Sequence, residues 1–148
     1  AAGLTMESGR LRELRERLTN LANNALSPED LIPRLRVDGH LPLAAITPAV
    51  MEGLRAMEPF GAGNPRPVFH TGAVQLTKKP RVMKNQHLSM SIRQGPRVFR
   101  AVAWRMANRA DFISQHSEQL DVAFNLTEND YRGEHTIELS VADIRQAR

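Results

Sequence analysis

The spacing of hydrophobic residues changes along this chain, from a helical period to the period of two that is typical of strands. Over residues 8–26, leucines recur every three or four positions with polar residues between them, which predicts an amphipathic helix. Ser27-Pro28 and Thr47-Pro48 each place a capping side chain before a proline, so each predicts the start of a further helix. Between these two helix starts, Leu35–Val37 predicts a short strand.

After residue 67 the pattern predicts five strands and one short helix. His87–Arg93 alternates strictly between apolar and polar residues, whereas Val98–Trp104 is apolar on both sides, as for a central strand. A turn around Gly133, within Asn129–Glu134, joins the last two strands. In chain order, the expected elements are strands at Val68–Thr77, His87–Arg93 and Val98–Trp104, a helix within Met106–Gln115, and strands with inward rows at Leu120–Leu126 and Ile137–Val141.

Three strands, a helix and two more strands follow the order of the OB-fold. This fold is a five-stranded Greek-key barrel that often binds oligonucleotides. We therefore expect a mainly β protein with N-terminal helices. The length of 148 residues and an apolar content of 41% allow one domain, or a small domain with a piece of another.

Composition excludes several classes of protein. The chain has no cysteine, so disulfides and thiolate metal sites are excluded. No run approaches the roughly 18 apolar residues of a membrane span, and no signal peptide is evident. The first residue is Ala1 rather than Met, which suggests a trimmed chain.

Charge is distributed unevenly along the sequence. The net charge is +4, but Pro59–Ala110 contains ten basic residues and no acidic one, whereas residues 111–148 contain eight acidic residues and three basic ones. Soluble surfaces normally intersperse acids and bases. The acid-free half of the barrel therefore indicates an anionic partner, most simply nucleic acid.

Candidate catalytic chemistry is absent from the sequence pattern. The five histidines are dispersed, without a second ligand at the familiar metal-binding spacings. The glycines of Gly61-Ala62-Gly63 do not lead from a strand into a helix, so we interpret them as loop residues rather than a phosphate cradle. Catalysis by this chain alone is not expected, and we predict no metal site in it.

Several motifs resemble the RecJ-type single-strand-specific DNA exonucleases, which belong to the DHH family. Glu58–Phe69 is similar to their Pro-Phe-Gly-x-Gly-Asn-Pro-x-Pro-x-Phe signature, which precedes a C-terminal OB-fold. One departure is Ser89, which stands where the family usually has a lysine. Weaker similarities lie at Ala1–Thr5, Arg36–Asp38, Leu41–Leu43, Gln86–Leu88, Asp121–Phe124 and Leu139–Arg145.

The resemblance implies that the chain is the C-terminal part of such an exonuclease. Residues 1–58 would be the tail of the DHH-associated domain and a connector, and residues 59–148 the OB-fold. The Asp-His-His site of the family matches nothing in this sequence, so no catalytic residue is assigned. Mn²⁺ or Mg²⁺ is implied for the complete enzyme, and no cofactor for this part.

The resemblance also implies a role in DNA repair and recombination, by 5′-to-3′ degradation of single strands in the cytoplasm. Expected partners are single-stranded DNA, the catalytic domains of the same protein, and single-strand-binding or helicase proteins. The alternative is a structural or protein-interaction module without independent DNA binding.

Candidate binding residues follow from the way OB barrels bind strands, across their second and third strands and between two flanking loops. Here the first loop holds four cations within Lys78–Lys84, and the second holds the chain's single tyrosine beside an arginine. The five phenylalanines are expected in the core, and Trp104 to be half-buried. The candidate nucleic-acid-binding residues are Lys78, Lys79, Arg81, Lys84, His87, Arg93, Arg97, Arg100, Tyr131 and Arg132.

Overall fold

Helix α1 (Leu11–Ala25) dominates the first of two compact units, residues 1–35 and 36–148. The computed structural model describes residues 3–131 and 134–147. Two 3-10 turns flank the helix, η1 (Ser8–Arg10) and η2 (Pro28–Leu31). The Asp30 carboxylate accepts hydrogen bonds from the Ser27 backbone N–H at 2.9 Å and its hydroxyl at 2.8 Å. The amphipathic helix and the helix start at Ser27-Pro28 are thus confirmed.

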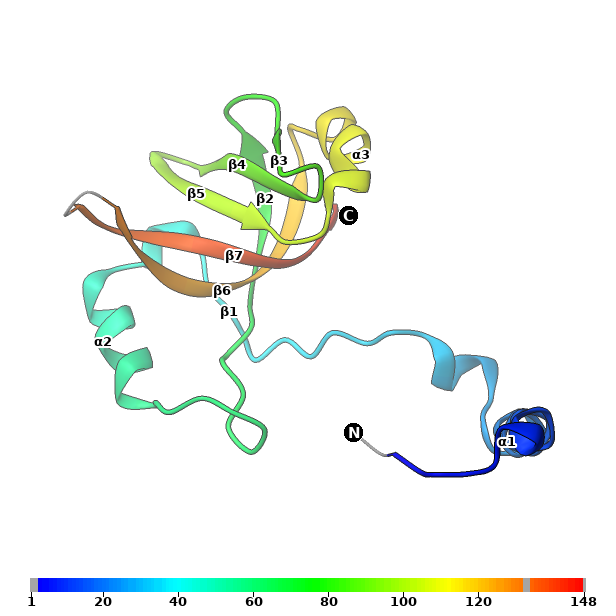
Figure 1. Ribbon diagram of the computed structural model, residues 1–148. Helices are drawn as coiled ribbons and strands as arrows, with labels where there is room; N and C mark the ends of the chain where they lie inside the picture. Colours follow the sequence, from blue (N-terminus) through cyan, green and yellow to red (C-terminus); the bar gives the residue numbers. More distant parts are fainter. Residues whose placement is uncertain (1–2, 132–133, 148) are drawn as a thin grey trace. The chain divides into compact units, whose positions relative to one another are not determined.

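A seven-stranded sheet organises the second unit (Figure 1). Helix α2 (Pro48–Ala56) precedes most of it, and α3 (Ala110–Gln115) lies between the fifth and sixth strands. Thr47 caps α2, as predicted, because its hydroxyl accepts a hydrogen bond from the Val50 N–H at 3.4 Å. Turns η3 (Leu43–Ala45) and η4 (Ala107–Arg109) precede the two helices. The strands are β1 (Gly39–His40), β2 (Phe69–Leu76), β3 (Arg81–Met83), β4 (His87–Gln94), β5 (Arg97–Ala103), β6 (Leu120–Tyr131) and β7 (Glu134–Gln146).

Five of these strands close a ring. The sheet order is β1-β2-β6-β7-β5-β4-β3, and a further pairing of β2 with β4 joins the two sides. β5 and β7 run parallel, while the other pairs in the ring are antiparallel. This is the connectivity of the predicted OB barrel, to which β1 and β3 add short outer strands.

An irregularity in β2 allows this strand to pair on both sides of the closure. Its register with β6 shifts between Thr71 and Val74, where Ala73 has a positive φ of 53°. Bulges of this kind bend a strand sharply. The Gln94 side chain holds the bend, because its Nε2 donates to the Gly72 carbonyl at 2.8 Å and its Oε1 accepts from the Leu43 N–H at 2.8 Å.

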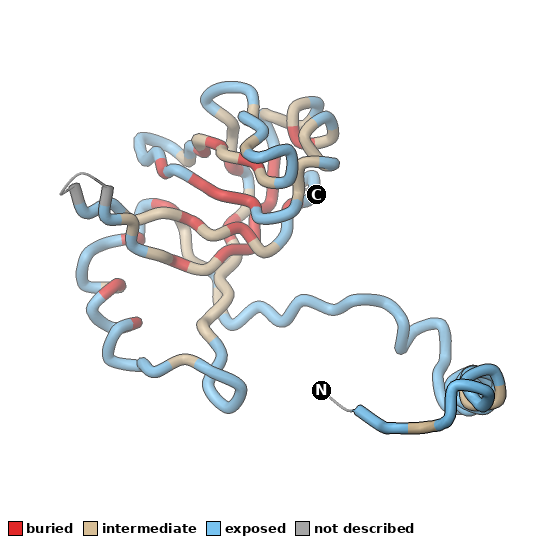
Figure 2. Tube along the Cα trace, in the orientation of Figure 1, coloured by how far each residue is buried: buried red, intermediate tan, exposed pale blue. Residues whose placement is uncertain are grey.

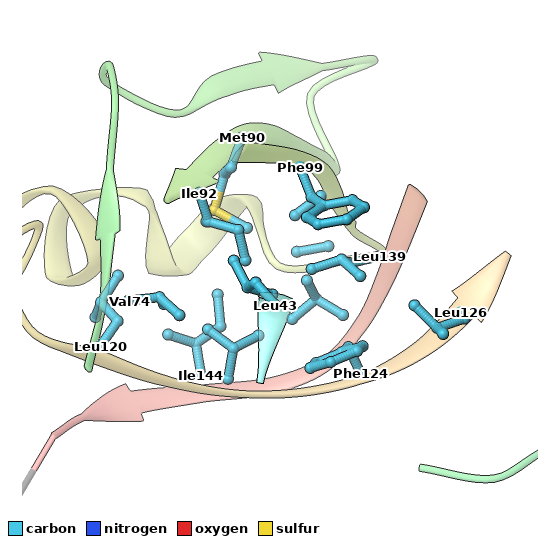
Figure 3. Close-up of a cluster of buried hydrophobic side chains, with 14 of the residues drawn as sticks. Leu43, Val74, Met90, Ile92, Phe99, Leu120, Phe124, Leu126, Leu139 and Ile144 are labelled. Carbon is cyan, nitrogen blue, oxygen red and sulfur yellow. The ribbon is translucent and has the colours of Figure 1, made fainter. Parts of the chain in front are cut away.

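The barrel core extends beyond the strands themselves. Phe124, Leu126 and Leu139 are fully buried (Figure 3), and Ile113 of α3 belongs to the same cluster. Leu43 before α2 also reaches this core, together with Ile46, Met51 and Leu54. The compact unit that contains the barrel therefore begins at Arg36, and Figure 2 shows the buried positions along it. The assignment of residues 1–58 to a DHH-associated domain and connector remains a prediction.

Three local predictions need correction. The short strand lies at Gly39–His40 rather than at Leu35–Val37, because only the later pair reaches Phe69 and His70 of β2. The basic loop after β2 contains a strand, β3, which was not predicted. Asn129–Tyr131 continue β6 instead of forming the turn, since they pair with β7 as far as Glu134. Gly133 lies outside the described residues.

Candidate nucleic-acid interface

A groove of about 960 Å³ lies over the outer face of the barrel. It is bounded by the loop after β2 and by β3 on one side and by the end of β6 on the other, with β4 and β5 between them. This is the face, between the same two loops, on which OB-folds bind oligonucleotides. The lining residues are Lys78, Lys79, Arg81, Ser89, Met90, Ser91, Arg100 and Asn129.

Strand alternation produces the polar floor of the groove. Leu88, Met90 and Ile92 of β4 are buried in the core, so Ser89 and Ser91 lie on the opposite, outer face. The register places Arg81 opposite Ser89 and Arg100 opposite Ser91. A row of hydroxyls is therefore flanked by a guanidinium on each side.

The two sides of the groove differ in free charge. Arg100 Nη1 lies 2.9 Å from Glu138 Oε1, an oxygen that also accepts from Asn129 Nδ2 at 2.8 Å. Among the described residues, no acidic side chain forms an ion pair with Lys78, Lys79 or Arg81. The positive charge available to an anion is thus concentrated on the Lys78–Arg81 side.

The remaining predicted cations are dispersed around the barrel. Arg93 Nη2 donates to Gln75 Oε1 at 2.5 Å. Arg97 donates to the Ile46 carbonyl at 3.0 Å, and its guanidinium lies 5.3 Å from the centre of the Phe99 ring. Lys84 occupies the exposed turn after β3, with a positive φ of 48°.

Two predicted residues lie at the loop between β6 and β7. Tyr131 ends β6, and its backbone pairs with Glu134. Arg132 lies outside the described residues. The structure therefore places Lys78, Lys79, Arg81 and Arg100 together in the groove, and it leaves the contribution of this second loop as a prediction.

Trp104 is more exposed than predicted. Its exposed fraction is 55%, and Val98 of the preceding strand β5 is 52% exposed. β5 is a central strand, as predicted, because it lies between β7 and β4. Its outer face is nevertheless exposed at Val98, although Val102 on that face is buried. The phenylalanines follow the prediction better, since Phe99 and Phe124 are buried and Phe69 and Phe112 pack against the core.

The loop that carries the RecJ-like signature has structural roles. Asn64 Nδ2 donates to the Met57 carbonyl at 2.8 Å and to the Pro59 carbonyl at 3.1 Å. The Arg66 guanidinium lies 4.6 Å from the centre of the Phe60 ring. Asn125 Nδ2 of β6 donates to the Pro67 carbonyl at 2.6 Å, which fixes the end of the loop to the barrel. The signature thus positions β2 next to β6.

Neither a metal centre nor a membrane span can be assigned to the described chain. Residues 3–131 and 134–147 contain no group of three or more His, Asp or Glu side chains arranged to hold a metal ion. The Mn²⁺ or Mg²⁺ of the RecJ-type enzymes therefore has no fitting donor set among these residues. In the same ranges, every helix is too short or too polar to cross a lipid bilayer.

Comparisons with known proteins agree with this geometry. The model of the RecJ OB domain family matches residues 37–143. The single-stranded-DNA-specific exonuclease RecJ of Bacillus subtilis is 33% identical over 63% of this chain and 12% of its own length. RecJ of Thermus thermophilus is 28% identical over 99% of the chain and 20% of its own length. The crystal structure of Thermus thermophilus RecJ in complex with Mg²⁺ superposes with a TM-score of 0.71 at 25% identity, covering 97% of this chain and 21% of that one.

These matches cover a small part of each relative, because the chain spans a quarter or less of the length of the curated proteins it resembles. Within the chain, the family match includes the segment before α2 and almost all of the barrel. The closed ring of strands, the basic groove and the extent of this match agree: the chain belongs to the RecJ OB domain family.

Proposed function

We propose that this domain binds single-stranded DNA in the groove over β4 and β5. The observation that carries the proposal is the juxtaposition of Lys78, Lys79 and Arg81 with the hydroxyls of Ser89 and Ser91. Cations and hydroxyl groups are the usual donors to phosphate oxygens. Phosphate contacts carry no sequence information, so the domain should bind all single strands alike.

The complete protein would be a RecJ-like exonuclease that degrades single-stranded DNA in the 5′-to-3′ direction, in the cytoplasm, during DNA repair and recombination. Support comes from relatives that are named single-stranded-DNA-specific exonucleases and from related crystal structures that contain Mg²⁺ or Mn²⁺. The hydrolysis and its metal would belong to catalytic domains outside this chain. The OB domain would hold the single-stranded DNA near the catalytic domains, which raises the local substrate concentration.

Salt dependence provides the test. A labelled oligo-dT is titrated with the chain at several salt concentrations, and fluorescence anisotropy gives the association constant. If about four phosphates are neutralised, the logarithm of this constant should fall with the logarithm of the salt concentration at a slope of about −3, from about −0.7 per phosphate.

Charge-reversal variants test whether the DNA binds in the groove. Lys78, Lys79 and Arg81 are changed together to Glu, which should weaken binding to every sequence and flatten the slope toward about −1. The matched control changes Arg12, Arg15 and Arg34 to Glu, because this alters the net charge equally in the first unit. Equal losses of DNA affinity in both variants would contradict binding in the groove. Absence of binding even at low salt would instead favour a structural or protein-interaction module.

A further inference from the structure

Trp104 continues the outer face of the barrel beyond the groove. It follows β5 directly, and its side chain is 55% exposed. Ser89 pairs with Val102 and Leu88 with Ala103, so His87 and Trp104 come next along the same pair of strands. The two rings meet edge to face, with centroids 4.9 Å apart and an interplanar angle of 68°.

A hydrogen bond from the Arg105 backbone fixes the orientation of the His87 ring, which contacts Trp104. The Arg105 N–H donates to His87 Nδ1 at 2.9 Å, and Arg105 has a positive φ of 57°. Since Nδ1 accepts this hydrogen bond, the neutral imidazole carries its proton on Nε2, where it is a donor. The indole is thus supported on one side by a ring whose orientation is set by the backbone, which reduces the entropy that a ligand must remove.

Polar and cationic residues flank His87 and Trp104 along the chain. A depression of about 380 Å³ is lined by Asn85, Gln86, Arg105, Ala107 and Asn108, of which Gln86 precedes His87 and Arg105 follows Trp104 in the chain. Side-chain amides can both donate to and accept from the edges of nucleobases. Lys84 is an exposed cation in the same turn as Asn85.

We propose that Trp104 and His87 form a stacking site for a nucleobase. The site lies at the end of the path that a bound single strand of nucleic acid would follow from the groove along β4. The ligand is one base of single-stranded DNA or RNA, and Lys84 or Arg105 binds its phosphate. This inference rests on the proposed function, because the same strand must occupy the groove. It adds an aromatic contact to a site that is otherwise electrostatic.

Intrinsic fluorescence tests the proposal directly, because Trp104 is the chain's single tryptophan. A labelled oligo-dT of about 16 nucleotides, long enough for one OB-fold, is added to the 148-residue chain while anisotropy and tryptophan emission are both recorded. Stacking should quench the emission in step with the rise in anisotropy. A rise in anisotropy with unchanged emission would overturn the stacking site and leave the groove intact.

Substitutions give a second, independent readout. Trp104→Ala should weaken binding about 5- to 150-fold without changing the salt slope, which corresponds to the stacking of one base. Trp104→Phe retains a ring and should lose less. Val98→Ala is the matched control, because Val98 is 52% exposed on the same face of β5, and it should bind like the wild type.

An abasic oligonucleotide separates the two proposals. It offers the same phosphates without bases, so the wild type and Trp104→Ala should bind it equally. A loss caused by Trp104→Ala that is as large for the abasic strand would contradict base stacking. Absence of binding to both the abasic and the base-containing oligonucleotide would instead count against the proposed function.

Discussion

Asp121 of β6 is buried, with an exposed fraction of 9%, and its carboxylate is confined on several sides. Arg145 of β7 lies 3.2 Å from Oδ2, and His70 Nε2 lies 3.8 Å from the same oxygen. A Cβ atom built at Gly72 would lie 2.8 Å from Oδ1. Because these contacts restrict movement of the carboxylate, a side chain at position 72 would have to displace Asp121 from its partners.

Gly72→Ala should therefore lower the free energy of unfolding by about 1–3 kcal/mol, the usual cost of forcing an extra group into a packed site. Urea denaturation followed by circular dichroism measures the change. Gly63→Ala is the control, because a Cβ at that position meets open space, and it should stay within about 0.5 kcal/mol of the wild type. Equal stability of Gly72→Ala and the wild type would show that Asp121 can move away.

Residues of the candidate site were predictable from the sequence to different degrees. Ser89 and Ser91 follow from strict alternation in β4. The partners of Arg93 and Arg97 do not, since a long side chain bonds to whichever group the tertiary fold brings near, here Gln75 and the Ile46 carbonyl. The exposure of Trp104 was missed because an apolar strand pattern does not show which face remains uncovered.

At the scale of elements, an ion pair joins α2 to β6. Arg55 and Glu128 form a hydrogen-bonded pair between residues 73 positions apart in the sequence. The hydrogen bond from Arg55 lowers the pKa of Glu128 below its ordinary value of 4.5 and the same interaction raises the pKa of Arg55. Because the folded state favours the ionised carboxylate, the pair stabilises the protein above that ordinary value and loses its effect as the pH falls through the lowered pKa.

Glu128→Gln should accordingly lower the melting temperature at neutral pH, and its difference from the wild type should shrink as the pH falls below about 4.5. Thermal melts at a series of pH values provide the measurement. Glu7→Gln makes the same change of charge in the first unit and controls for net charge. A difference that stays constant down to strongly acidic pH would contradict a role for the ionised carboxylate.

Alanine substitutions at two glycines should change the stability of the protein in opposite directions. Gly53 is exposed within α2, and a Cβ atom at this position would meet open space, so Gly53→Ala should stabilise the protein by about 0.5–1 kcal/mol. Gly95 links β4 and β5 at a φ of +57°, so Gly95→Ala should destabilise it by about 1 kcal/mol. Denaturant titrations of both variants measure these changes, and stabilisation by Gly95→Ala would contradict the turn geometry.

At the scale of the whole molecule, the two units differ in how they are stabilised. None of the residues that the structure describes in α1 is buried, and a 15-residue helix is marginal without tertiary contacts. The strands of the barrel, in contrast, surround a continuous core. The order of elements predicted this barrel, but the packing of Leu43 and Ile46 into its core was not predictable, because their partners lie far later in the chain.

Hydrogen exchange should show this difference. Backbone amides of α1 should exchange orders of magnitude faster than those in the middle of β4 and β6, since local opening requires no disruption of the core. Mass spectrometry of peptides after timed exchange in D₂O provides the measurement. Protection of α1 equal to that of β6, in a chain shown to be monomeric, would contradict the marginal stability expected of α1.

Amide chemical shifts in the presence of unlabelled oligo-dT test the DNA-binding groove most directly. With the ¹⁵N-labelled chain, the largest changes should lie at Lys78–Arg81, Ser89–Ser91 and Arg100, continue to His87 and Trp104, and diminish as salt is added. Changes confined to α2 and the signature loop, or absent at low salt, would contradict the assignment of the groove as the site for single-stranded DNA.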